Sequence, residues 1–313
     1  MRLSAPIVFE PIFMDRVWGG RRLGTHFGKR LPLHGRIGES WEIVDRPEAQ
    51  SVVHNDPLRG KTLHDLWTAC RSDIFGTRIP DSPRFPLLLK LLDAHDRLSV
   101  QVHPPAGVAP SLHGEPKTEM WYILDTYGDA DIFAGLRAGV TRADFETALR
   151  AGSVEQTVQR LPVAPGDSIF IPSGRIHAIG AGNVIVEVQQ NSDTTYRVFD
   201  WNRVGLDGKI RQLHVDESLQ SIDFTDFEPA LQDPAAPILV DCPYFRVEKW
   251  ELAEPREASP PGDFAIFTLL TGAVRFTNLE FLPGDFFLVP AALEDRILYP
   301  VAEQTSLLRT TVP

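Results

Sequence analysis

The sequence contains little cysteine, no long apolar run and no excess of positive charge. Its two cysteines, Cys70 and Cys242, lie far apart and outside any Cys-x-x-Cys spacing, which argues against a disulfide framework and a thiolate metal site. No apolar run approaches the ~20 residues that span a bilayer, so a membrane protein is not expected. No apolar stretch of secretory type follows the first residues, and the cytoplasm is therefore the expected location.

The charge balance excludes one large class of partners. Lys and Arg number 31 against 42 Asp and Glu, a formal net charge of -11. Binding to a nucleic acid needs a broad basic surface that neutralises backbone phosphates, so such a partner is not expected. One or two lysines or arginines can still bind a small phosphorylated molecule. The expected partner is a small molecule, and no oligomeric state is predicted.

Proline and glycine are plentiful, and they punctuate short β-rich runs. The 26 prolines and 23 glycines are spread along the 313 residues, a pattern typical of a β-sandwich or barrel rather than a wound α/β sheet. The sequence therefore predicts a mostly β fold. The expected strands are 85–92, 98–103, 118–125, 168–171, 184–190, 245–250, 265–270, 274–276, 285–289 and 306–309.

Two short stretches have helical spacing. Apolar residues follow Thr62 at the spacing of one helix face, and others follow Thr141, which has Asp144 three residues on. A hydroxyl residue followed three positions later by an acidic one is typical of a capped helix start. We expect small helical elements that decorate the β-core.

A repeated pattern and a polar stretch suggest two domains. The segment 165–172, Pro-Gly-Asp followed by a short apolar strand and a proline, is echoed by 283–290, which indicates a repeated β-unit. No histidine follows the second copy, so we expect a repeat of shape without the chemistry. The Pro- and Asp-rich stretch 226–240 predicts a linker between a first domain, 1–225, and a smaller β-domain, 241–313.

Candidate metal ligands occur on three separate β-segments. The strand period of two puts Ser99, Gln101 and His103 on one face. Glu119 follows on the next expected strand, and His177 comes just after a strand and a Ser-Gly turn. Each segment alone fits a solvent-facing strand or a surface loop better than a metal site. Together they offer amide, imidazole and carboxylate donors of the types that bind Zn²⁺ or a similar divalent ion.

These segments resemble a known family. Gln101–Pro104, Lys117–Trp121, Pro172–Ala178 and Asn191–Arg197 resemble the two cupin motifs, and more closely the short bacterial form of type I mannose-6-phosphate isomerases. Val17–Gly20 and Gly38–Glu42 fit the same form. The resemblance implies a cupin double-stranded β-helix, or jelly roll, as the catalytic domain. It also implies that the smaller domain is cupin-like and has no metal ligands.

The resemblance implies an activity, a cofactor and a set of ligands. The implied reaction interconverts mannose 6-phosphate and fructose 6-phosphate by proton transfer through an enediol or enediolate. The implied cofactor is one Zn²⁺ ion per chain, and the expected partner is a sugar phosphate. The implied metal ligands are Gln101, His103, Glu119 and His177.

The resemblance also implies roles for other residues. Arg197 would stabilise the developing oxyanion, a role that suits a guanidinium because it stays charged and offers forked donors. Lys117 and Ser99 would contact the substrate. Glu187 would either relay protons or pair with Arg197 or Lys117 to hold the geometry. Glu39 could reach the cleft, although a strand with alternating faces explains it nearly as well.

Two other classes of function remain possible at this point. A metal-dependent cupin oxygenase would use Fe²⁺ and usually more histidines than the two found here. A non-catalytic sugar-binding cupin would keep the barrel without turnover. The presence of Lys117, Arg197 and all four ligand candidates argues against such a loss of activity.

Overall fold

The computed structural model describes residues 3–201 and 203–313. Residues 1, 2 and 202, which belong to the predicted first domain, lie outside the described residues. Strands greatly outnumber helices in the described part of the chain, so the mostly β prediction is confirmed. No helix in these ranges is both long and apolar enough to cross a membrane.

The chain divides into two compact units, each built from separate stretches of sequence. Unit 1 contains residues 1–12, 41–89 and 233–313, and unit 2 contains residues 13–40 and 90–232. The predicted division at 226–240 runs along the sequence, whereas the structure places 41–89 with the C-terminal strands. Part of the predicted linker is also a strand, since β14 begins at Ile238. The domain boundaries themselves stay a prediction.

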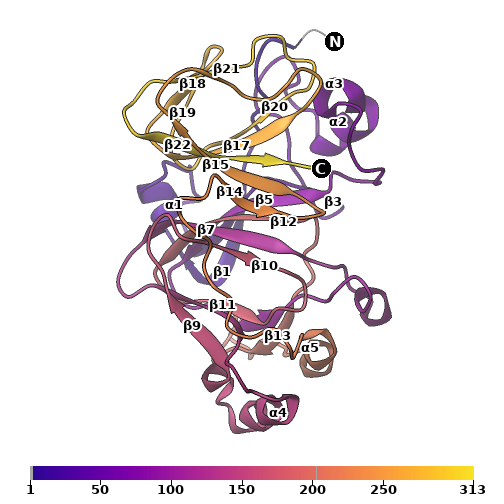
Figure 1. Cartoon of the computed structure of the whole chain (residues 1–313), viewed down its shortest axis with the longest axis vertical. Coiled ribbons are helices and arrows are strands. Elements are labelled where there is room, and N and C mark those ends of the chain that lie inside the picture. The colour runs from indigo at the N-terminus through magenta and orange to yellow at the C-terminus, as the bar shows by residue number, and fades with distance from the viewer. Residues whose placement is uncertain (1–2, 202) are drawn as a thin grey trace. The chain divides into compact units, whose positions relative to one another are not determined.

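Unit 2 holds two antiparallel sheets (Figure 1). The first has the order β13-β6-β11-β8-β9, and the second has the order β1-β2-β5-β12-β7-β10. Strands β2 and β5 contribute their residues 37–40 and 90–94 to this unit. Its elements are β1 (Ile12–Gly20), α1 (Arg22–Thr25), β2 (Ile37–Ile43), β5 (Leu87–Ala94), β6 (Val100–Val102), η1 (Ala109–Leu112), β7 (Glu119–Thr126), β8 (Asp131–Leu136), α4 (Arg142–Ala151), η2 (Val154–Gln156), β9 (Val158–Pro162), β10 (Ser168–Ile171), β11 (His177–Ile179), β12 (Asn183–Gln190), β13 (Tyr196–Phe199) and α5 (Val215–Ser221).

Neighbouring strands in these sheets are often distant in sequence, as in a jelly roll. Strand β11 lies between β6 and β8, and β12 lies between β5 and β7. One buried cluster contains Trp18, Trp121 and Ile179, so it draws on both sheets. A second cluster, which includes Val100, Val102 and Phe145, joins the other face of the five-stranded sheet to α4 and η2.

The alternation of side chains on β6 follows the predicted pattern. Val100 and Val102 are fully buried in the outer cluster, which leaves Gln101 to face the other way. The strand is shorter than expected: residues 98–103 were predicted, and β6 contains only Val100–Val102. Leu98 belongs instead to the cluster between the sheets.

The predicted helices both form with the expected caps. Helix α2 (Leu63–Ala69) begins after Thr62, and α4 begins after Thr141. In each case the threonine side chain accepts from the backbone N–H three residues later, and the aspartate there accepts from the threonine N–H. This capping box satisfies donors that a helix start would otherwise leave unpaired.

Unit 1 is also built on two sheets, with orders β14-β15-β22-β17-β20 and β16-β21-β18-β19. Helices α2 and α3 belong to this unit because Phe75 packs against Phe264 with a ring separation of 5.3 Å, and Ala291 N–H donates to the carbonyl of Ile74. Its other elements are β3 (Asp45–Arg46), β4 (Ala49–Gln50), α3 (Arg71–Phe75), β14 (Ile238–Asp241), β15 (Arg246–Leu252), β16 (Arg256–Glu257), β17 (Ala265–Thr271), β18 (Val274–Phe276), β19 (Leu279–Phe281), β20 (Phe286–Val289), β21 (Ile297–Pro300) and β22 (Thr305–Thr311).

The two copies of the repeated pattern form the same turn. Gly166 has φ +101° and Gly284 has φ +88°, a left-handed conformation that favours glycine. Asp167 accepts from the N–H of Ala164 at 2.9 Å, and Asp285 accepts from that of Leu282 at 2.8 Å. The strands β10 and β20 follow directly.

Candidate metal centre and substrate pocket

Both sheets of unit 2 contribute to one cluster of donor side chains. Gln101 on β6 pairs in register with His177, the first residue of β11. His103 comes directly after β6, and Glu119 is the first residue of β7 in the opposite sheet. The cluster therefore forms where the ends of three strands meet, and residues 101, 103, 119 and 177 come together although they are far apart in sequence.

The distances in the cluster fit a bound divalent ion. His103 Nε2 lies 3.5 Å from Glu119 Oε2, and His177 Nε2 lies 3.6 Å from Glu119 Oε1. Ligand atoms about 2.1 Å from a tetrahedral Zn²⁺ lie about 3.4 Å from one another. All three side chains are buried, and one ligand atom of each lies within 4.8 Å of the others. They could hold one metal ion.

Both histidines turn Nε2 toward the cluster. Nδ1 of His103 lies 2.8 Å from the carbonyl of Thr194, and Nδ1 of His177 lies 2.8 Å from that of Arg175. In each ring Nδ1–H donates to the carbonyl, which leaves the lone pair on Nε2. Burial, reinforced by Lys117, lowers the pKa of His103 to about 4, and burial also lowers that of His177. Neutral imidazoles are the form that binds metals.

Three buried atoms of the cluster, His103 Nε2 and both carboxylate oxygens of Glu119, have no hydrogen-bond partner in the described part of the chain. Of these, Glu119 Oε2 forms an ion pair with Lys117. A buried acceptor without a donor is costly, and a cation between His103 Nε2 and Glu119 Oε1 would satisfy both atoms. The donor chemistry and the orphaned atoms therefore fit a metal site.

Gln101 borders the cluster with its amide. Its Nε2 lies 3.3 Å from His177 Nε2, and its Oε1 accepts from Ser99 Oγ at 3.4 Å. The orientation of an amide is an assignment made from its hydrogen bonds. Half a turn of the amide would bring the oxygen, the ligand atom expected from the sequence, to the position that faces His177.

A network of buried charges joins the cluster to a pocket. Lys117 Nζ lies 2.7 Å from Glu119 Oε2 and 3.7 Å from Glu187 Oε1, and Lys90 Nζ lies 3.2 Å from the same atom of Glu187. Burial opposes ionisation of Glu119, but the charge of Lys117 outweighs it and holds the pKa of Glu119 well below the usual range. Burial likewise opposes the charge on Lys117, and the two glutamates raise its pKa in spite of it. Both groups are therefore charged at neutral pH.

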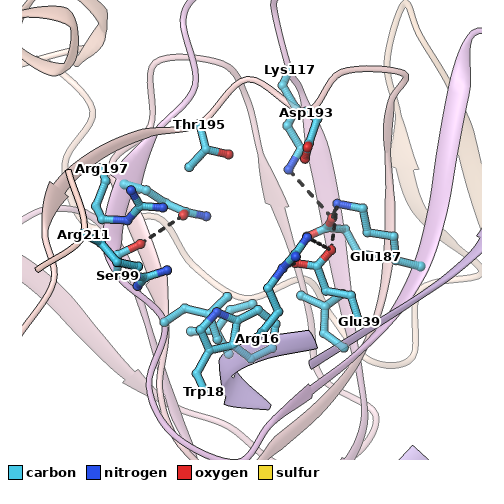
Figure 2. Close-up of a pocket in the computed structure, with 15 residues that line it drawn as sticks. Arg16, Trp18, Glu39, Ser99, Lys117, Glu187, Asp193, Thr195, Arg197 and Arg211 are labelled. Atoms are coloured by element: carbon cyan, nitrogen blue, oxygen red, sulfur yellow. Dashed lines mark hydrogen bonds and ion pairs between the residues drawn. The ribbon is translucent and has the colours of Figure 1, made fainter. Parts of the chain in front are cut away.

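The pocket lies within unit 2 and is mostly polar (Figure 2). One side carries alternating charges, with Arg16 bound to Glu39 at 2.8 Å and the lysines bound to Glu187. The opposite side carries Ser99, Arg197 and Arg211. The lining residues are Arg16, Trp18, Glu39, Lys90, Leu92, Leu98, Ser99, Gln101, Lys117, Ile179, Glu187, Asp193, Thr195, Arg197 and Arg211.

The residues expected at the site from sequence are close together. Ser99, Lys117, Glu187 and Arg197 all line the pocket, and Glu39 does so too. Of the two pairings considered for Glu187, the structure contains the one with Lys117, at 3.7 Å. Trp121 also donates to Glu187 Oε2, at 3.1 Å.

Sequence reasoning missed several lining residues. Asp193 and Thr195 lie inside a segment already singled out, and Arg16 directly precedes another. Lys90 had a signal of its own, because a lysine inside the apolar run 87–92 must find a partner when it is buried. Arg211 lies in a polar loop and carries no such signal.

Comparisons with known proteins identify relatives of this chain. The sequence model for "Phosphomannose isomerase type I, catalytic domain" matches residues 8–126. Mannose-6-phosphate isomerase ManA of Bacillus subtilis is 38% identical, over 96% of this chain and 98% of that protein. The mannose-6-phosphate isomerase of Streptococcus mutans is 36% identical, over 91% of this chain and 94% of its own.

Solved structures extend the likeness to the whole fold. The crystal structure of the mannose 6-phosphate isomerase from Bacillus subtilis matches with a TM-score of 0.87 at 31% identity, covering 99% of this chain and all of the other. A putative mannosephosphate isomerase from Archaeoglobus fulgidus has the same fold, with a TM-score of 0.80 at 21% identity. The predicted fold class, a mostly β cupin jelly roll with small helical elements and a second, smaller cupin-like β-domain, is confirmed. The chain belongs to the type I phosphomannose isomerase family.

Proposed function

We propose that this protein interconverts mannose 6-phosphate and fructose 6-phosphate in the unit 2 pocket, the activity for which its relatives are named. The observation that carries the proposal is the buried donor cluster at the pocket. Gln101 and Lys117 line the pocket and also contact His177 and Glu119 of the cluster. A sugar in this pocket would therefore lie next to the cluster.

The proposed cofactor is one Zn²⁺ ion bound by Gln101, His103, Glu119 and His177. Two neutral imidazoles, one amide and one carboxylate leave a site of about +1 charge, which suits a catalytic zinc. When bound, such an ion supplies Lewis-acid polarisation to oxygen atoms of the substrate. The two histidines and one carboxylate would also suit Fe²⁺, so the experiment below must also identify the metal.

Arg197 is proposed to stabilise negative charge on the sugar oxygen. It lies on β13 directly across from Gln101, so its guanidinium is held beside the metal cluster. Its Nη1 donates to the carbonyl of Gln212 at 2.9 Å. Its Nε is buried and has no hydrogen-bond partner within the described residues. A fixed donor of this kind favours an enediolate, in which an oxygen gains charge, over the neutral sugar.

Glu187 and Lys117 are proposed to act on the transferred proton from the opposite side. Glu187 Oε1 accepts the proton that leaves one carbon and returns it to the neighbouring carbon. Lys90 and Lys117, whose Nζ atoms lie 3.2 and 3.7 Å from Glu187 Oε1, hold this carboxylate in place. Ser99 Oγ, on the Arg197 side, is proposed to contact a sugar hydroxyl.

The proposal extends to the division between the units. Within the described residues, His103, Glu119 and His177 are the one group of such side chains close enough to hold a metal, and all three belong to unit 2. We therefore place catalysis in unit 2 and a structural role in unit 1. We also propose a cytoplasmic location.

The test combines turnover with metal analysis. Purified protein is incubated with mannose 6-phosphate in heavy water, before and after treatment with a chelator. We expect fructose 6-phosphate to form, to stop forming once the metal is removed, and to reappear when Zn²⁺ is added. Turnover that survives complete metal removal would overturn the metal assignment. A protein with one bound ion per chain and no isomerisation would overturn the proposed reaction.

A further inference from the structure

Arg197 and Arg211 lie side by side on one side of the pocket, and no carboxylate of the described residues separates them from its interior. Figure 2 shows Arg197 and Arg211 together with Ser99, opposite Lys117 and Glu187. Burial and the nearby positive charge of Arg211 lower the pKa of Arg197. Neighbouring like charges repel each other, so this arrangement is costly when the pocket contains no anion.

Asp200 fixes the position of Arg211 from behind. This carboxylate is buried and accepts from Arg211 Nε at 2.6 Å and from Arg203 Nε at 3.0 Å. Arg211 Nη2 makes a further, shorter bond to it. Burial opposes the charge on Asp200, but the bonds from the two arginines outweigh it and lower its pKa. Asp200 therefore stays ionised at neutral pH and remains bound to Arg211.

The two arginines that share Asp200 point to different places. Arg203 turns away from the pocket, where its Nη1 donates to the carbonyl of Arg97 and lies 3.7 Å from Asp96. Arg211 lines the pocket. Its Nη1 has no hydrogen bond to any residue in the described ranges. One donor group thus stays available on the pocket side.

Two acidic groups on the opposite side already have cations, since Glu39 is bound by Arg16 and Glu187 is bound by Lys90 and Lys117. A third, Asp193, also lines the pocket on the Lys117 side. Within the described part of the chain, Arg197 forms no ion pair with a carboxylate. An anionic ligand would therefore be attracted to the side with the two arginines rather than to the side that carries these carboxylates.

The pairing of β13 with β6 shows which of the two arginines lies nearer the metal cluster. Arg197 pairs with Gln101 and Phe199 pairs with Val100, so the chain runs from the metal cluster toward the start of β6 before it reaches Asp200. Trp201 confirms the direction, because its Nε1 donates to the carbonyl of Leu98. Arg211, held on Asp200, is consequently farther from the metal cluster than Arg197.

We propose that Arg211, positioned by Asp200, binds the phosphate group of the sugar and makes the pocket selective for phosphorylated substrates. The inference rests on the proposed function and assigns the two ends of the substrate. The carbons that exchange the proton lie near Gln101 and Arg197, and the phosphate lies at Arg211. A guanidinium suits this task because it presents forked donors to two phosphate oxygens.

The test compares Arg211→Gln with Arg203→Gln, which removes the other partner of Asp200. Inorganic phosphate is used as the probe, both as a competitive inhibitor of turnover and in direct calorimetric titration of the metal-loaded protein. We expect Arg211→Gln to weaken phosphate binding and to raise KM for mannose 6-phosphate about 30-fold, the loss expected for a hydrogen bond between charged groups. Arg203→Gln should change both quantities by less than about threefold, because Arg203 points away from the pocket and Arg211 keeps its own bonds to Asp200.

Further variants separate positioning from folding. Asp200→Asn should weaken phosphate binding by less than Arg211→Gln, and Arg211→Lys should restore part of it because the charge returns. Circular dichroism and thermal unfolding check that each variant is folded. Equal effects of Arg211→Gln and Arg203→Gln would overturn the inference, and so would a wild-type protein that does not bind phosphate. A wild type that binds phosphate through Arg211 and fails to isomerise the sugar would instead overturn the proposed function alone.

Discussion

In unit 2 part of the space between the sheets contains buried histidines, glutamates and lysines, whereas in unit 1 phenylalanines from both sheets pack against one another. The same glycine-aspartate turn leads into β10 and β20. Five residues after Pro172 comes the buried His177, and five residues after Pro290 comes the exposed Asp295. One backbone pattern therefore supports either a ligand site or a plain core, and the side chains that point inward decide which of the two forms.

One buried carboxylate from each unit, Asp45 and Glu119, illustrates the same difference. Asp45 in unit 1 accepts from Gln50 at 2.8 Å, from Arg84 at 3.0 Å and from the N–H of Phe85 at 2.9 Å. Glu119 in unit 2 has an oxygen with no donor in the described part of the chain. A satisfied buried charge stabilises the fold, whereas an unsatisfied one is kept for a ligand.

The largest effect is expected from removing the ligand carboxylate. Glu119→Gln should lower kcat/KM by on the order of 10³-fold, because a bound ion contributes several kcal/mol of charge stabilisation. The bound metal per chain, measured by elemental analysis, should fall with it. Glu251→Gln on the surface of unit 1 serves as the control and should keep both values. Normal metal content with lost activity would show that Glu119 acts on the substrate rather than on a metal.

The next effect concerns the phenylalanine core of unit 1. Phe287 stacks on Phe281 with ring centroids 4.0 Å apart and on Phe267 at 5.3 Å. Phe287→Ala should lower the free energy of unfolding by about 3–5 kcal/mol, measured by urea titration. The folded variant should still bind its metal, since the ligand candidates belong to unit 2. A variant that is folded and has lost its metal would contradict the separation of roles.

The third effect depends on pH. Burial opposes the charge on Asp45, but its hydrogen bonds outweigh it and lower the pKa. The stabilisation is therefore complete above the unfolded value of about 3.9 and is lost as the pH falls through the lower folded value. Asp45→Asn should cost about 2 kcal/mol of unfolding free energy at pH 7. The difference in unfolding free energy between Asp45→Asn and the wild type should become smaller below about pH 4. A difference that does not change with pH would show that the charge of Asp45 is not its cause.

The smallest effects test the shared turn. Asp167→Asn and Asp285→Asn each weaken one hydrogen bond to a backbone N–H in the turn. Each should cost about 0.5–1 kcal/mol of unfolding free energy, and the two values should agree closely. Neither should change KM. A change in KM for Asp167→Asn would show that the first turn helps to place the site.

Much of the local structure could be predicted because its causes are local. The capped helices after Thr62 and Thr141 form as expected, and β10 and β18 have the predicted bounds. Strands β1, β9 and β13 were not predicted. Strand β13 has only four residues and pairs with β6, which is distant in sequence, and no local pattern reveals that pairing.

The candidate site could be predicted in part for the same reason. Residues inside recognisable motifs, such as His103, Glu119 and Arg197, could be singled out before their distances were known. Arg211 could not, because its importance comes from a bond to Asp200, eleven residues earlier, and from the pocket that it faces.

The order of residues alone was enough to establish the β-rich character, the family and the donor types at the metal site, because each depends on short patterns. The fold was needed to show that helices α2 and α3 pack with C-terminal strands, that the histidines expose Nε2, and that two arginines share one side of the pocket. These features depend on contacts between segments far apart in the chain, and such contacts exist only after the sheets have formed.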